Sequence, residues 1–169
     1  MKLILSDRPL KFKPENDSFV FIDLSVLNIA NCVGCFGCLT KTPGKCVIRD
    51  DAAKVYPAIA KSDTLLYISR IKYGGYDTVM KKMLERAIPV QQAFIRLVDG
   101  ETHHVQRDVK PKNATIIAYG DISDEEKGLF EKLVARNALN MNFEKYNIIY
   151  SVESLLEAAV NKEVEKWKK

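Results

Sequence analysis

The stretch Thr64-Leu-Leu-Tyr-Ile-Ser69 is an almost unbroken apolar run. Such a run is typical of a central parallel strand that helices cover on both faces. Asp77 follows as a candidate N-cap, and a helix is expected from there to Pro89. Its apolar residues fall at helical spacing: Val79, Met80, Met83, Leu84 and Ala87. A strand followed by an amphipathic helix is one unit of a parallel α/β sheet.

The same alternation continues on both sides of this unit. Further strands are expected at Met1–Ser6, Ser18–Leu24, Ala114–Tyr119 and Tyr146–Tyr150. The expected helices are one capped by Asp50 and Asp51, in which Pro57 implies a kink or a late start, one opened by the capping box Ser123–Glu126, and one from Ser151 onward. The pattern predicts an α/β fold with a three-layer, doubly wound parallel sheet.

Length and composition narrow the class of protein. The chain has 169 residues, of which 47% are hydrophobic and 28% charged, as expected of one globular domain spanning residues 1–169. No apolar run is long enough for a membrane-spanning helix. The net charge of +4 is spread along the chain, which argues against nucleic-acid binding. The first residues are too soon interrupted by charge for a signal peptide, so a soluble, cytoplasmic protein is expected.

Ligands of such sheets bind at the carboxyl ends of the strands. The relevant loops therefore begin at Ser6, Leu24, Ser69 and Tyr119. No acid–base pair or nucleophilic triad is recognisable there, so catalytic residues stay unassigned.

The segment 88–112 interrupts the alternation and carries both histidines, His103 and His104. It is interpreted as an exposed excursion, with a catalytic histidine and an intersubunit arm as alternatives.

All four cysteines lie in one window with the spacing C-x2-C-x2-C-x7-C: Cys32, Cys35, Cys38 and Cys46. Four thiolates at such spacing can hold a [4Fe–4S] cluster. Zinc usually takes two separated C-x-x-C pairs instead. Free thiols or a redox-active pair within Cys32–Cys38 are the other interpretations.

Three stretches resemble a known family. The segment Asn31–Asp51, the segment Ser69–Tyr76 and, more weakly, Tyr119-Gly-Asp121 are similar to those of flavodoxin-like NAD(P)H-dependent FMN reductases and iron–sulfur flavoproteins. The resemblance implies FMN as cofactor, with NAD(P)H and an unknown electron acceptor as partners. It also implies that two loops approach the flavin ring: Ser69, Arg70, Ile71, Lys72, Tyr73, Gly74 and Gly75 in one, and Tyr119, Gly120 and Asp121 in the other.

The sequence departs from this family at the phosphate loop. Only Asp7–Asp17, with Pro9 and Pro14, separates the first two strands, so the first crossover helix is expected to be reduced or missing. Ser6 and Arg8 remain as candidates to touch the FMN phosphate. Arg70 replaces a proline of the family, and its side chain would either stabilise reduced, anionic flavin or turn outward.

A missing helix would leave apolar sheet surface bare beside the first strand. A homo-oligomer or a paired subunit is therefore expected to cover it. Three functions follow from these observations. The first is an FMN-dependent NAD(P)H oxidoreductase, the second an iron–sulfur electron carrier using the four cysteines, and the third a non-catalytic flavodoxin-like subunit that has lost FMN.

Overall fold

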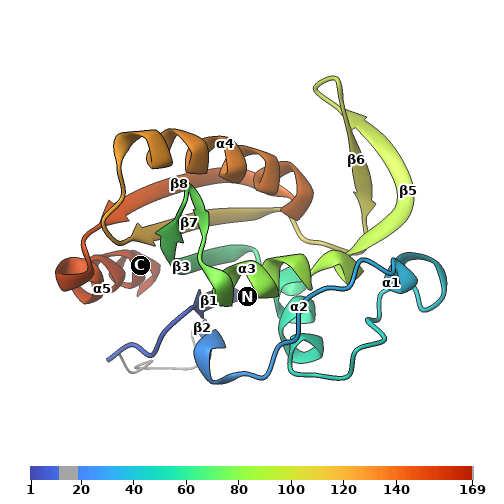
Figure 1. Ribbon diagram of the computed structural model, residues 1–169, viewed down its shortest axis with the longest axis horizontal. Helices are drawn as coiled ribbons and strands as arrows, with labels where there is room; N and C mark the ends of the chain where they lie inside the picture. The colour runs from blue at the N-terminus through green and yellow to red at the C-terminus, as the bar shows by residue number, and fades with distance from the viewer. Residues whose placement is uncertain (12–18, 169) are drawn as a thin grey trace.

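The computed structural model describes residues 1–11 and 19–168. Five parallel strands form the central sheet, in the order β2-β1-β3-β7-β8 (Figure 1). They are β1 (Lys2–Ser6), β2 (Phe19–Asp23), β3 (Thr64–Lys72), β7 (Lys112–Tyr119) and β8 (Phe143–Ser151). The predicted parallel sheet is confirmed, and each predicted strand is present. Ser18, the expected start of the second strand, lies outside the described residues.

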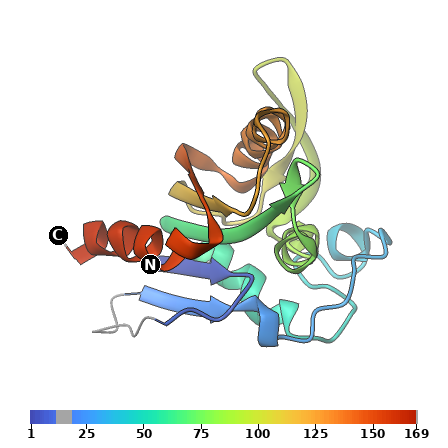
Figure 2. The same ribbon diagram turned by 60° about the vertical axis from the view of Figure 1, so that its left-hand side comes forward.

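Helices cover the sheet on both faces (Figure 2). One face carries α2 (Ala52–Lys61), α3 (Thr78–Glu85) and α4 (Asp124–Met141). The other carries α5 (Leu156–Glu165). Alternate residues of the strands divide between these faces: Leu3 and Leu5 pack toward the first, whereas Ile4 packs toward α5. The shorter helical segments are η1 (Leu24–Val26), α1 (Gly37–Thr40), η2 (Ile88–Val90), η3 (Glu153–Leu155) and η4 (Lys166–Lys168).

The predicted helix starts are largely confirmed. Asp77 accepts a hydrogen bond from the backbone N–H of Thr78 at 2.7 Å, and Ser123 forms a reciprocal capping box with Glu126. The N-cap of α2 is Asp51, whose side chain makes no capping hydrogen bond, and the carboxylate of Asp50 accepts from the Ala52 N–H at 3.1 Å instead. Since α2 begins at Ala52 and runs through Pro57, the expectation of a late start is wrong.

The first crossover agrees with the sequence as far as the structure describes it. Residues 7–11 contain no helix, and Pro14 lies outside the described residues. The apolar face beside β1 is nevertheless not bare, which corrects the expectation from sequence. Ile4 is completely buried, because α5 packs across it and Leu10 and Trp167 pack against the same apolar cluster.

The segment 88–112 contains a two-stranded hairpin, β5 (Gln91–Val98) and β6 (Glu101–Gln106), which projects from the body in Figure 1. Asp99 and Gly100, both with positive φ, form its turn. The inner side is polar: the Arg96 guanidinium donates to the Leu139 carbonyl, and Glu101 pairs with Arg136 at 2.8 Å. The exposed excursion predicted from the sequence is confirmed.

The side chain of His103 makes structural contacts rather than facing a cavity or a cofactor loop. The His103 ring lies 2.9 Å from the Asn140 side-chain oxygen and 3.1 Å from Glu101, and therefore joins the hairpin to α4.

The outer side of the hairpin is apolar, because the side chains of Phe94, Ile95 and Leu97 are 71%, 58% and 76% exposed. This inversion, with polar groups inward and apolar groups outward, leaves an uncovered hydrophobic surface.

The cysteine segment is held to the body by one buried ion pair. Arg86, at the end of α3, is 1% exposed and donates to the two carboxylate oxygens of Asp50 at 2.6 and 2.9 Å. Its guanidinium also donates to the carbonyls of Ala30 and Ile48.

Within the described ranges, no helix is long and apolar enough to cross a membrane.

We expect Arg86→Met to lower the free energy of unfolding by about 3–5 kcal/mol, because it leaves the buried Asp50 carboxylate without its partner. The control is Glu85→Gln, which removes the exposed pair of Glu85 with Lys81 and should cost less than about 1 kcal/mol. Urea denaturation followed by circular dichroism measures both. Equal losses in the two variants would contradict this role of Arg86.

Candidate functional site

The ends of three strands meet at the carboxyl edge of the sheet. The parallel register places Ser6 of β1 beside Ile68 of β3, and Arg70 of β3 beside Tyr119 of β7. Four residues that the sequence assigned to the cofactor are thus brought together here: Ser6, Ser69, Arg70 and Tyr119. Arg8 joins them from the loop after β1.

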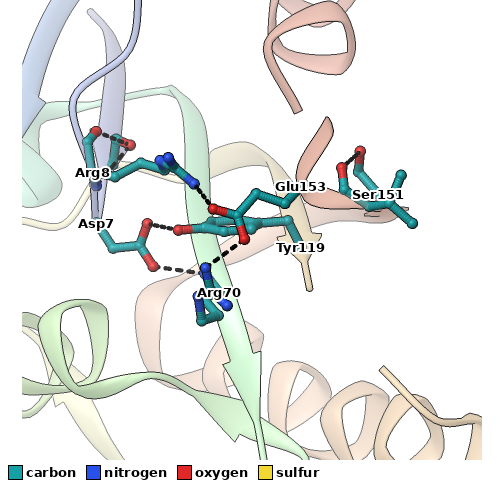
Figure 3. Close-up of polar contacts among 8 residues, drawn as sticks. Asp7, Arg8, Arg70, Tyr119, Ser151 and Glu153 are labelled. Atoms are coloured by element: carbon teal, nitrogen blue, oxygen red, sulfur yellow. Dashed lines mark hydrogen bonds and ion pairs between the residues drawn. The ribbon is translucent and has the colours of Figure 1, made fainter. Parts of the chain in front are cut away.

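Asp7, which the sequence reasoning missed, is the centre of this edge. Its carboxylate accepts hydrogen bonds from the Arg70 backbone N–H at 2.6 Å and from the Tyr119 hydroxyl at 2.8 Å, and a longer one from Ser69 at 3.3 Å. Figure 3 shows Asp7 pointing at the hydroxyl end of Tyr119. Burial raises the pKa of Asp7, and the hydrogen bonds oppose that rise only in part.

Next to Asp7, the guanidinium groups of Arg8 and Arg70 are bridged by the carboxylate of Glu153. Arg8 donates to one carboxylate oxygen of Glu153, and Arg70 donates to the other, each at 2.6 Å. The two guanidinium groups lie against the Tyr119 ring, 5.6 and 5.4 Å from its centroid, and Figure 3 shows them on either side of it. We call Arg8 and Arg70 the arginine pair. It holds the pKa of Glu153 below its usual range.

Glu153 was also missed from the sequence. It is the first residue of η3, which follows β8 directly, and the backbone N–H of Gly120 donates to the Ser151 carbonyl at 3.1 Å. This bond ties the end of β8 to the loop after β7. The side chain of Glu153 is 48% exposed, so the bridge lies at the surface.

The other residue assigned to the phosphate, Ser6, is engaged in its own turn. Its buried hydroxyl donates to the Arg8 carbonyl at 2.7 Å and accepts from the Arg8 N–H. Asp121 is exposed beside Gly120, whose φ is +131°. Of the predicted phosphate contacts, Arg8 therefore has the more accessible side chain.

The loop assigned to the flavin ring is a tight hairpin. β3 continues to Lys72, turns through Tyr73 and Gly74, both with positive φ, and returns as β4 (Gly75–Tyr76). Ile71 is buried in the core, whereas Tyr73 is 88% exposed. A Cβ atom at Gly74 would lie 2.7 Å from Leu129 of α4, so this turn needs glycine.

A cavity of about 690 Å³ opens beside this turn, between α3 and α4. Its walls combine aromatic and aliphatic groups with amides and two lysines. The lining includes Lys72, Tyr73, Tyr76, Lys81, Leu133 and Asn137. Half of the lining residues are polar or charged, the acids Asp77 and Glu85 among them, so the cavity offers polar and apolar contacts to a small molecule. Only Lys72, Tyr73 and Gly75 of the predicted ring loop contribute to it.

The four cysteines form a separate site. All are free thiols; Cys35 is exposed and Cys38 is buried. Burial raises the pKa of Cys38, and so does the proximity of the other three cysteines, Cys46 foremost. Across residues 1–11 and 19–168, no three His, Cys, Asp or Glu side chains are arranged to hold a metal ion. Figure 1 places α1, which contains Cys38, at the opposite end of the molecule from α5.

Comparisons with known proteins point to the same fold as the sequence does. No protein-family model matches the chain. A stretch of 74 residues is 30% identical to an iron–sulfur flavoprotein of Methanocaldococcus jannaschii and covers 44% of this chain. That stretch spans only 37% of the relative's own length.

Two solved structures match almost the whole chain, each at 12% identity. An FMN-dependent NADH-azoreductase from Bacillus anthracis gives a TM-score of 0.56 and matches over 98% of this chain and 95% of its own. An NAD(P)H:quinone oxidoreductase from Methanothermobacter marburgensis gives 0.63, over 99% and 96%. At such low identity these matches show the fold, which is flavodoxin-like.

The protonation of the Asp7 carboxyl makes the free energy of unfolding depend on pH. Because the pKa of its folded state is raised, the folded protein holds the proton more firmly than the unfolded chain does. The contribution of Asp7 to stability is therefore greatest at low pH and declines as pH rises toward the folded-state value. We expect the stability of Asp7→Asn relative to the natural protein, measured by urea denaturation, to increase as the pH rises above the ordinary aspartate value of 3.8. A difference that does not change with pH would contradict the raised pKa.

Proposed function

We propose that this chain is an FMN-dependent NAD(P)H oxidoreductase that binds the flavin at the carboxyl edge of its sheet. The observation that carries the proposal is the arginine pair, which lies against Tyr119 where parallel sheets bind their ligands. The matched azoreductase structure contains FMN, and the fold is the same.

The residues present fit the phosphate of FMN in an unusual way. Residues 7–11 contain no helix whose N-terminus could receive the phosphate, and the Ser6 hydroxyl is already bonded. Two guanidinium groups remain, and guanidinium recognises phosphate through paired, charge-assisted hydrogen bonds. Charged side chains would here replace the backbone N–H groups of a phosphate loop.

The chain's own residues would position the cofactor. Arg8 and Arg70 would neutralise the phosphate, and Tyr119 would hold both cations in place through its ring. The turn at Tyr73 and Gly74 would flank the isoalloxazine ring, and the adjoining cavity offers room for a nicotinamide or an acceptor. When bound, FMN would accept a hydride from NAD(P)H and pass the electrons onward. Asp7 would keep the three strand ends together.

We also propose that the protein works in the cytoplasm and with a second chain. The four free thiols suit a reducing compartment. The outer side of the hairpin, at Phe94, Ile95 and Leu97, is the apolar surface that another copy or a paired subunit would cover.

A second candidate function is electron transfer through a [4Fe–4S] cluster. The sequence spacing of Cys32, Cys35, Cys38 and Cys46 suits such a cluster, although among the described residues these thiols are not arranged to hold a metal ion. The partial match to an iron–sulfur flavoprotein also supports it.

For the flavin, we expect FMN fluorescence to be quenched on titration with the protein, and riboflavin to bind at least tenfold more weakly because it lacks the phosphate. Arg70→Ala should remove most of this preference, while Lys145→Ala, which removes an exposed charge on β8, should keep it. No uptake of FMN would refute the proposal and leave a flavodoxin-like binding subunit.

For the cluster, protein purified without oxygen should be brown, contain about four iron and four sulfide per chain, and bleach on reduction. Cys38→Ser should lose the iron, and so should Cys35→Ser. Colourless, iron-free protein after anaerobic reconstitution with iron and sulfide would exclude this second function.

A further inference from the structure

Glu153 occupies the position between Arg8 and Arg70 that an external anion would take. Each of its carboxylate oxygens accepts from one guanidinium at 2.6 Å. We propose that Glu153 is an exchangeable internal ligand of a phosphate site, and that it sets the selectivity of this site for phosphate monoesters. The identification of FMN as one such ligand rests on the function proposed above; the site itself requires only a phosphate group.

The charges at the site favour a dianion. Arg8 and Arg70 together carry two positive charges, and Glu153 neutralises only one of them. The nearby Asp7 also interacts with Arg8, but burial raises the pKa of its carboxyl and so favours the neutral form, which leaves the second charge of the arginine pair unbalanced. A phosphate monoester that displaced Glu153 would balance both guanidinium charges, whereas a monoanion such as chloride would balance one.

The hydrogen bonds favour the same exchange. The carboxylate receives one bond from each arginine, through Nη1 of Arg8 and Nη2 of Arg70. A guanidinium can offer two parallel N–H donors to one anion. A phosphate has three terminal oxygens, so it could accept from both forks more fully than the carboxylate does.

Glu153 can leave at low cost. Its side chain is 48% exposed, and the two arginines are 38% and 41% exposed, so water can solvate the separated charges. Exposed ion pairs of this kind contribute little to stability. Glu153 also stands at the start of a three-residue helical turn in which no residue is buried. A change of side-chain rotamer is enough to move the carboxylate into solvent.

The arginine pair would remain in place after this exchange. Both guanidinium groups rest on the Tyr119 ring, and the Tyr119 hydroxyl is fixed by Asp7. Asp7 also holds the backbone of Arg70. These contacts do not involve Glu153, and Figure 3 shows Arg8 and Arg70 on either side of the Tyr119 ring. An incoming phosphate would meet donors that are already positioned.

The test compares Glu153→Gln with the natural protein by isothermal titration with inorganic phosphate, FMN and riboflavin. We expect phosphate and FMN to bind about fivefold to tenfold more tightly to Glu153→Gln, because the competing carboxylate is gone, and riboflavin to be unaffected. The control is Glu157→Gln, which removes the same charge from an exposed position one turn further on. Arg70→Ala in the Glu153→Gln background should abolish the gain.

Either of two results with phosphate would overturn the inference. One is equal affinity for phosphate in Glu153→Gln and the natural protein, and the other is an equal gain in Glu157→Gln, which would indicate a general charge effect. Tighter phosphate binding by Glu153→Gln without any FMN binding would keep this inference and refute the flavin function. FMN binding that is unchanged by Glu153→Gln would keep the flavin function and refute this inference.

Discussion

The buried carboxylate of Asp7 holds together the edge on which the rest of the site depends. It joins the end of β1 to the backbone of Arg70 at the end of β3 and to the Tyr119 hydroxyl at the end of β7. Burial of an acid is costly unless donors surround it, and here three donors do. The carboxylate fixes Tyr119, whose ring in turn supports Arg8 and Arg70.

This arrangement compensates for a short first connection. In the described residues 7–11 no helix follows β1, so neither a helix N-terminus nor a covering helix is supplied there. Cover for β1 comes instead from α5, which buries Ile4. Positive charge comes from the arginine pair. Under the function proposed above, these side chains would perform at this edge the task that backbone N–H groups perform in a phosphate loop.

Local patterns predicted most of the fold, and long-range contacts explain the residues that were missed at the site. The apolar run at Thr64–Ser69 and the caps Asp77 and Ser123 are properties of neighbouring residues, and the structure confirms them. The hairpin was missed although Asp99-Gly100 is a strong turn signal. At the site, the strand ends led to Arg70 and Tyr119, which the structure places side by side. Asp7 and Glu153 were missed because their partners lie 63 to 145 residues away in the sequence.

The central claim is that the arginine pair receives the phosphate of FMN at this edge. Phosphorus NMR tests it most directly, because FMN carries a single phosphorus atom. On addition of the protein, the resonance should shift and broaden, and in Arg70→Ala it should return to the position of free FMN. A resonance that stays at the free position in the natural protein would contradict the claim, as would an unchanged shift in Arg70→Ala.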